Sequence, residues 1–221
     1  MAKQKWKPGN MVYPLPAVLV SCADKEGHAN LMTAAWTGTI CSEPPMVYVS
    51  IRKERYSHHM IQETGEYVIN LTTEKLARAT DFCGVRSGKD MDKFKEMHLT
   101  PIRGELKYAP MVAESPVSIE CRVTNILELG SHDMFMAEVT AVYVDAQYMD
   151  EKGTFHLEES APLVYSHGQY YGLGRHLGRF GYAVRKKPAG SAARKKVAGS
   201  VAHKKPTGSV AHKKPVKKIT G

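Results

Sequence analysis

The sequence predicts a mainly β fold, a β-barrel with short helices, followed by a basic C-terminal tail that we expect to be disordered. Two segments, 117–124 and 135–143, alternate apolar and polar side chains with a period of two, as antiparallel strands with one buried face do. The candidate helices are few and short, and no long helix separates consecutive strands, which argues against parallel βαβ units. Six or more strands interrupted by small helices are typical of a decorated barrel.

The first part of the chain contains four apolar runs separated by turn residues. Asp24-Lys25-Glu26-Gly27 joins the first two runs, so we expect them to pair as a hairpin, and Ser42-Glu43-Pro44-Pro45 ends the second run. The expected strands cover residues 16–23, 30–39, 46–52 and 66–71.

Three short helices are expected between the strands. The first runs from Ser57 to about Glu63, with Ser57 suited to be its N-cap and Gly65 just beyond its end as a C-cap signal. The other two are expected over residues 74–82 and 90–97.

The two alternating segments are expected to form a hairpin across residues 130–133. On the first segment, one face carries Val117, Ile119, Cys121 and Val123, and the opposite face carries Ser118, Glu120, Arg122 and Thr124. On the second segment, the inward set is expected to be Phe135, Ala137, Val139, Ala141 and Tyr143.

The charge of the chain is divided unevenly between a body and a tail. Twelve of the 31 Lys and Arg residues lie in residues 185–221, which contain no Asp or Glu, so residues 1–184 hold 19 cationic and 22 acidic side chains and a net charge of −3. Lys-Lys pairs recur every nine residues, at 186, 195, 204 and 213. We therefore expect one folded domain over residues 1–184 and a disordered Lys-rich tail over residues 185–221.

The cysteines, the start of the chain and its hydropathy together predict a cytoplasmic protein with reduced thiols. Cys22, Cys41, Cys83 and Cys121 show no C-x-x-C spacing, and no signal peptide precedes them. No apolar run approaches the length of about 18 residues that a membrane helix needs. The ten histidines show no metal-ligand spacing, so no metal site is expected.

Two neighbouring segments indicate a flat ligand that carries a phosphate. Asn30 to Thr37 and Val47 to Arg52 both end in small, hydroxyl-bearing or cationic groups, and a helix begins soon after at Ser57. Strand backbone can lie against a flat ring, while Arg52 and a helix N-terminus can hold a dianion.

The body resembles the flavin reductase-like, FMN-binding split-barrel family, and specifically its flavoredoxin-like branch. The resemblance covers about residues 10–182 and depends on the order and spacing of five motifs, which occupy residues 21–36, 44–52, 55–58, 65–71 and 87–94. It implies a homodimer that binds FMN non-covalently near the dimer interface. It also implies electron transfer through the flavin, from NADH or NADPH as a transient donor or from a protein partner, to an acceptor.

The resemblance also implies which residues hold the flavin. These are Thr33, Ala34, Ala35, Trp36, Ser50, Ile51, Arg52, Ser57, His58, Cys83, Gly84, Ser87 and Lys93. No catalytic residue is required, but His167 or Tyr170 is a candidate to face the open side of the flavin, and a solvated loop histidine is the alternative.

Several of these residues have structural alternatives. Trp36 is also a candidate core residue, Arg52 a solvated charge, and Lys93 a partner of Asp90 or Asp92 on a surface helix. Cys83 is interpreted as a small packing residue, because no base partner is apparent that would make it a nucleophile.

Three functions follow from the sequence. The first is an NAD(P)H-dependent flavin reductase, and the second is a flavin-binding electron carrier without NAD(P)H turnover. The third is a protein associated with nucleic acid, or with another anionic surface, through residues 185–221, whose charges could contact phosphates without sequence specificity. A solvated tail without a binding partner is the alternative for these residues.

Overall fold

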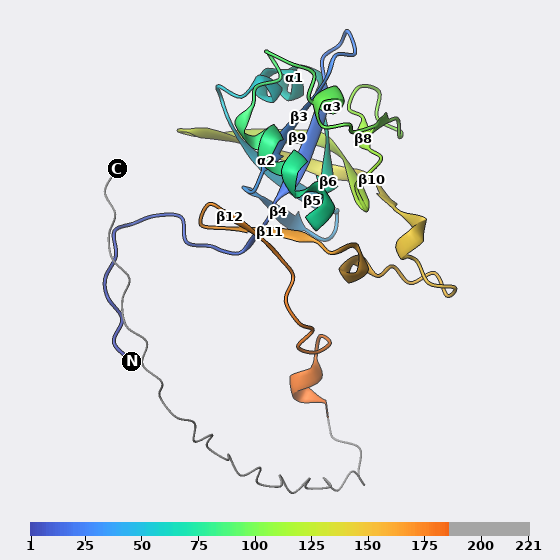
Figure 1. Cartoon of the computed structure of the whole chain (residues 1–221). Helices are drawn as coiled ribbons and strands as arrows, with labels where there is room; N and C mark the ends of the chain where they lie inside the picture. The colour runs from blue at the N-terminus through green and yellow to red at the C-terminus, as the bar shows by residue number, and fades with distance from the viewer. Residues whose placement is uncertain (186–221) are drawn as a thin grey trace, which may run out of the picture. The chain divides into compact units, whose positions relative to one another are not determined.

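The computed structural model describes residues 1–185, and residues 1–175 form one compact unit built around a seven-stranded antiparallel sheet (Figure 1). The strand order is β3-β2-β6-β9-β10-β5-β4. The bounds of these strands are β2 Val18–Ala23, β3 Ala29–Ala34, β4 Thr37–Cys41, β5 Met46–Arg52, β6 Glu66–Leu71, β9 Val117–Leu129 and β10 His132–Val144.

The two edge strands β3 and β4 show that this sheet curls into a barrel. They lie at opposite ends of the strand order, yet only Ala35 and Trp36 separate them in the chain. The sheet must therefore bend until its ends approach each other. The backbone N–H of Ser50 in β5 donates to the Trp36 carbonyl at 2.8 Å, which extends the β4–β5 pairing into the connection between β3 and β4. The predicted mainly β barrel with short helices is confirmed.

Three short helices and several 3-10 turns decorate the barrel. Helix α1 covers Tyr56–Thr64, η1 Glu74–Leu76, α2 Ala77–Val85 and α3 Lys93–Glu96. Figure 1 shows α1, α2 and α3 close to β3. Leu19 and Leu31 pack against Leu76, Ala79, Cys83 and Phe94, so strands β2 and β3 bury their outer faces beneath α2 and α3 as well as their inner faces in the barrel.

Smaller elements complete the described residues. Strand β1 (Leu15–Pro16) joins β11 (Leu163–Ser166) and β12 (Gln169–Gly172) in a second sheet, and β7 (Pro101–Ile102) pairs with β8 (Met111–Val112). The 3-10 turns η2 and η3 cover Ala146–Tyr148 and Leu157–Ser160, and η4 covers Tyr182–Val184 in a second unit that begins at His176. Within residues 1–185, no helix combines the length and the apolar character needed to cross a bilayer.

The predicted strand over residues 30–39 is wrong as a single element. The chain forms β3 and β4 instead, and these pair with different neighbours, β2 and β5. The apolar pattern continues through Ala35 and Trp36, but barrel closure requires the chain to leave one strand pair and join another at that point. By contrast, the strands predicted over 46–52 and 66–71 are confirmed as β5 and β6.

The predicted helices are present but shifted. Helix α1 begins at Tyr56, and its N-cap is Arg55 rather than Ser57, with no side chain capping it. Gly65 caps its end in the left-handed conformation, with φ +69° and its N–H bonded to the Ile61 carbonyl, as the sequence predicted. The helix expected over 74–82 becomes η1 followed by α2, and that over 90–97 shrinks to α3.

The β9–β10 hairpin forms as predicted, but two polar residues of β9 are buried. Ser118 is 4% exposed and Glu120 is 0% exposed, although the alternation placed both opposite the apolar face. The backbone N–H groups of Glu105 and Leu106 donate to the Glu120 carboxylate at 2.9 and 3.3 Å, and Ser118 donates to the Asn70 side-chain oxygen at 2.8 Å. The loop that carries Glu105 and Leu106 therefore satisfies the buried Glu120 carboxylate, and Asn70 of the neighbouring strand β6 satisfies Ser118.

Candidate functional site

Two adjoining cavities lie between β3, the β5–α1 connection and α2. One, of about 310 Å³, we call the cationic cavity, and the other, of about 390 Å³, the aromatic cavity. Both are lined by Met32, Arg52, Arg55 and Val85, so they meet along these four residues.

The cationic cavity carries an excess of positive charge. Four cations line it, Arg52, Arg55, Arg86 and Lys93, against one acidic side chain, Glu54. Glu54 pairs with Arg52, at 3.4 Å and with both side chains largely exposed, so this pair offsets little of the charge. Such a cavity favours an anion with more than one negative charge.

Lys93 is a buried cation without a carboxylate partner among the described residues. It is 3% exposed, and its ammonium donates to the carbonyls of Leu31 at 2.6 Å and Cys83 at 3.2 Å. Burial, aided by the nearby charge of Arg55, lowers the pKa of Lys93. Neither Asp90 nor Asp92 forms an ion pair with it in the described part of the chain, so the surface pairing considered from the sequence is absent. The structure leaves a charge that an anion in the cavity would compensate.

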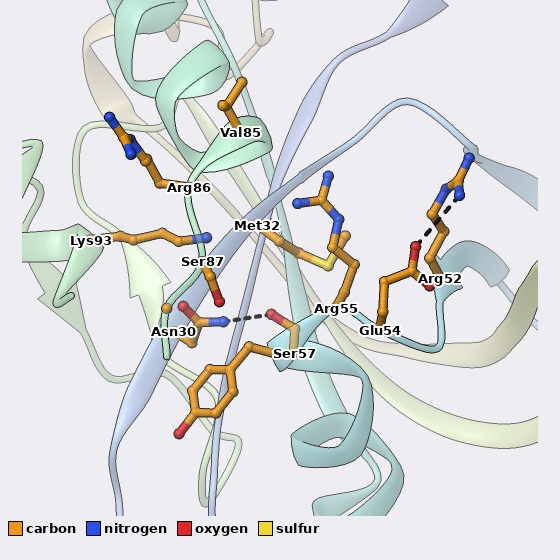
Figure 2. Close-up of a pocket in the computed structure, with 12 residues that line it drawn as sticks. Asn30, Met32, Arg52, Glu54, Arg55, Ser57, Val85, Arg86, Ser87 and Lys93 are labelled. Atoms are coloured by element: carbon orange, nitrogen blue, oxygen red, sulfur yellow. Dashed lines mark hydrogen bonds and ion pairs between the residues drawn. The ribbon is translucent and has the colours of Figure 1, made fainter. Parts of the chain in front are cut away.

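Two neutral side chains are fixed at the floor of the same cavity. The side-chain amide of Asn30, on β3, donates to the Ser57 hydroxyl, on α1, at 2.8 Å, and both residues are buried (Figure 2). Gly88 packs against this pair, because a Cβ at position 88 would overlap the Asn30 side chain. Figure 2 shows Lys93 and Arg55 reaching into the same space from different elements.

The first turn of α1 also faces this cavity. Arg55, Tyr56 and Ser57 line it, no side chain caps the helix, and no acidic residue occupies its first turn. The unsatisfied N–H groups of a helix N-terminus favour an anion.

The aromatic cavity has one wall of closely packed backbone. Thr33, Ala34, Ala35 and Trp36 form this wall, and Ser50 and Gly84 lie beside them. The Thr33 hydroxyl is bonded to the Thr80 carbonyl. A Cβ at Gly84 would lie 3.3 Å from the Thr33 Cβ, so glycine permits α2 to lie this close to β3. Small side chains leave this wall accessible to a flat ring.

Four rings line the aromatic cavity, and one of them belongs to Trp36 at the end of this wall. The indole of Trp36 and the imidazole of His132 are parallel within 4°, with centroids 6.4 Å apart. Tyr165 is tilted toward Trp36 at 6.4 Å and packs edge-on against Tyr170 at 5.9 Å. Burial and the nearby charge of Arg52 lower the pKa of His132, so this ring stays neutral at physiological pH.

Ten of the thirteen residues that the resemblance pointed to line one or both of these cavities. The aromatic cavity receives Thr33, Ala34, Ala35, Trp36, Ser50 and Gly84, the cationic cavity receives Ser57, Ser87 and Lys93, and Arg52 lines both.

Ile51, His58 and Cys83 do not line either cavity. Ile51 and Cys83 are fully buried in the hydrophobic core. His58 is bonded to Asp133 at 2.8 Å and packs edge-on against Phe135. Burial raises the pKa of the Cys83 thiol to about 11, which suits the interpretation of Cys83 as a packing residue.

Of the two residues that were candidates to face the open side of the flavin, only one lines a cavity. Tyr170 lines the aromatic cavity, whereas His167 is exposed, adopts a positive φ of +47° and packs against Tyr13 at 4.4 Å. His167 does not line either cavity.

Several lining residues were absent from the sequence-based set. Asn30 and Arg55 lie inside two of the motifs on which the resemblance depends, so the sequence could have identified them as site residues. Asp81, Arg86 and His132 lie outside these motifs, and the fold brings them to the cavities. The described residues contain no group of three His, Cys, Asp or Glu side chains able to hold a metal ion.

Comparison with known proteins gives consistent matches. The sequence model of the family described as "Flavin reductase like domain" matches residues 11–174. The flavoredoxin of Desulfovibrio vulgaris (Miyazaki F) superposes with a TM-score of 0.77 at 32% identity, over 83% of this chain and 100% of that one. The flavoredoxin of Methanosarcina acetivorans gives a TM-score of 0.76 at 30% identity, over 84% and 100% of the two chains.

A relative from Aeropyrum pernix is 33% identical over 156 residues, or 70% of this chain. The match spans 58% of that relative's length, and the relative is itself uncharacterized.

Proposed function

The chain belongs to the flavin reductase-like domain family, and from this premise we propose that it binds FMN across the two cavities and acts as a flavin-dependent oxidoreductase. The two adjoining cavities together form one cleft. The observation that carries the proposal is that the buried ammonium of Lys93, which has no carboxylate partner among the described residues, lies at one end of this cleft, while aromatic rings line the other end. A phosphate at one end and a flat heterocycle at the other match this division of the cleft.

The phosphate is assigned to the cationic cavity. Arg52, Arg55 and Arg86 can present forked N–H donors to it, Lys93 a point charge, and Ser57 a hydroxyl. The uncapped first turn of α1 adds backbone N–H donors. Since this cavity carries more positive than negative charge, a phosphate dianion would relieve the cost of burying Lys93.

The isoalloxazine ring is assigned to the wall formed by Thr33, Ala34, Ala35 and Trp36 in the aromatic cavity. The small side chains there permit close approach of the backbone to the ring, and Ser50 lies alongside. When bound, flavin supplies the redox chemistry, accepting a hydride from a nicotinamide and passing electrons to an acceptor. The protein's part is to bind, orient and shield the ring.

NADH or NADPH is the proposed electron donor, binding transiently over the flavin. The alternative is an electron carrier that receives electrons from a protein partner. The similarity to two flavoredoxins supports this alternative. We also propose the homodimer that the family resemblance implies, which the mass of the protein in solution would test.

Anaerobic addition of NADH or NADPH to the FMN-loaded protein distinguishes the two functions. Prompt bleaching of the flavin absorbance supports the reductase. Bound flavin that neither nucleotide bleaches, but that a chemical reductant does, supports the carrier.

Residues 185–221 are proposed to attach the protein to nucleic acid. This tail contains twelve cationic and no acidic residues, and its Lys-Lys pairs recur every nine residues, which favours contact with a polyanion. The tail lies beyond the residues that the family model matches. The expected disorder of this tail concerns residues that, apart from Arg185, lie outside the described part of the chain.

A further inference from the structure

The aromatic cavity contains an acidic group that flavin binding does not explain. Asp81, on α2, is the sole acidic side chain among the described residues that line this cavity. Asp81 is exposed, forms no ion pair within residues 1–185, and lines the cavity together with Tyr170. An unpaired carboxylate among aromatic rings is an arrangement suited to a flat cation.

The fold holds the rings and the carboxylate together. Tyr165 and Tyr170 are opposite residues of the β11–β12 hairpin, and their rings meet edge-on at 5.9 Å. A Cβ at Gly172 would overlap the Glu74 carboxylate, so the end of β12 packs tightly against η1, which leads directly into α2. This contact sets the position of Tyr170 relative to the helix that carries Asp81.

The positive charges of the cavity lie at its other end. Arg52 and Arg55 are shared with the cationic cavity, and Arg55 donates to the Gly84 carbonyl at 2.6 Å. Asp81, Trp36, Tyr165 and Tyr170 line the aromatic cavity alone. The cleft therefore has a cationic end and, beyond the junction, an anionic aromatic end.

We propose that Asp81, together with the rings of Trp36, Tyr165 and Tyr170, forms a subsite for a planar pyridinium cation, the oxidised form of the nicotinamide donor. This inference rests on the proposed function. A dihydronicotinamide ring is neutral, and it becomes a pyridinium when the C–H bond at C4 breaks and the hydrogen leaves with both electrons to the flavin. A carboxylate and aromatic faces stabilise the positive charge that develops in this step more than they stabilise the neutral ring.

The titration of Tyr170 supports this assignment of charge. Burial and then the negative charge of Asp81 raise the pKa of Tyr170. The phenol therefore stays neutral at physiological pH, and the negative charge at this end of the cavity belongs to Asp81.

Calorimetric titration tests the subsite with two probes of nearly the same shape. The pyridinium cation 1-methylnicotinamide, methylated on the ring nitrogen, and neutral nicotinamide are titrated into the oxidised FMN-loaded protein and into the flavin-free protein. We expect the cation to bind about tenfold more tightly than the neutral ring, and Asp81→Asn to reduce this preference to about twofold or less. Asp90→Asn, which changes a carboxylate that lines neither cavity, is the matched control and should leave the preference unchanged.

Steady-state kinetics provides a second test of the subsite. Asp81→Asn should lower kcat with NADH or NADPH by about tenfold, with a smaller change in KM and no change in FMN affinity. An equal preference for the two probes in the wild-type protein, with FMN bound, would overturn the subsite and leave the proposed function standing. Absence of FMN binding would overturn the proposed function, while the probe titration of the flavin-free protein would still report on Asp81.

Discussion

The Asn30 side-chain amide donates to the Ser57 hydroxyl at 2.8 Å, and this bond joins an edge strand of the barrel to the first turn of α1. Asn30 and Ser57 are only 3% and 1% exposed, so the bond is shielded from water. It fixes the Ser57 hydroxyl at the cationic cavity, where the proposed phosphate requires a rigid donor.

Gly88→Ala is expected to weaken FMN binding by disturbing this bond. The new Cβ would overlap the Asn30 side chain, which would have to move away from Ser57. Loss of about one hydrogen bond predicts a two- to tenfold rise in the FMN dissociation constant, measured by quenching of flavin fluorescence. Gly174→Ala is the control, because a Cβ there meets nothing within 4 Å. Equal affinities of both variants and the wild type would mean that the Asn30–Ser57 bond is not needed for binding.

Lys93→Met is expected to weaken FMN binding without lowering the stability of the flavin-free protein. FMN affinity should fall by about tenfold or more, because a charge-assisted contact to the phosphate is lost. The flavin-free variant should be at least as stable as the wild type at neutral pH, because a buried charge without a carboxylate partner is removed. Lys95→Met, on the exposed side of the same helix, should change neither quantity.

The stability difference between the wild type and Lys93→Met should depend on pH in a defined direction. The pKa of Lys93 is lowered in the folded protein from its ordinary value of 10.5. Between the lowered value and 10.5 the unfolded chain binds more protons, so the wild type gains stability as pH rises through this window. Urea unfolding of both flavin-free proteins should therefore show the advantage of the variant shrinking at alkaline pH. A constant difference would mean that the Lys93 pKa is not lowered.

His58→Ala is expected to reduce stability without altering the cleft. His58 holds Asp133 at 2.8 Å and packs on Phe135, and it lines neither cavity. The midpoint of thermal unfolding should fall, while the folded protein keeps its FMN affinity. His59→Ala, which alters the exposed neighbouring residue, serves as the control. A large loss of FMN affinity in folded His58→Ala would restore the role that the family resemblance implied for this residue.

Removal of residues 185–221 is expected to abolish retention on DNA at low salt. The tail supplies 12 positive charges, whereas residues 1–184 carry a net charge of −3. For the full chain, the logarithm of the binding constant should fall with the logarithm of salt concentration, with a slope of about −0.9 per phosphate contacted. Equal retention of the full chain and residues 1–184 would contradict attachment through the tail.

The parts of the fold that local signals determine were predictable from the sequence. Pro44-Pro45 and Gly65 mark where β5 and β6 begin, and both strands have the predicted bounds. The division between β3 and β4 was not predictable in this way, because it results from closure of the barrel rather than from any turn residue at Ala35 or Trp36.

Burial of polar groups was the main feature that local patterns missed. Lys93 fitted a surface helix by sequence, and Glu120 fitted the polar face of β9, yet they are 3% and 0% exposed. Their partners are backbone groups of segments distant in the chain, the Leu31 carbonyl and the Glu105 N–H. A motif could therefore point to Lys93, but only the packing of α3 against β3 reveals it as a buried charge facing the cleft.

The affinity of the purified protein for FMN compared with riboflavin tests the central claim most directly. The two ligands share the isoalloxazine ring and ribityl chain and differ only in the phosphate. Several charge-assisted contacts in the cationic cavity predict that FMN binds at least about 100-fold more tightly than riboflavin, and that Lys93→Met narrows the ratio. Equal affinities for the two flavins, or no binding of either, would contradict the assignment of the cleft to FMN.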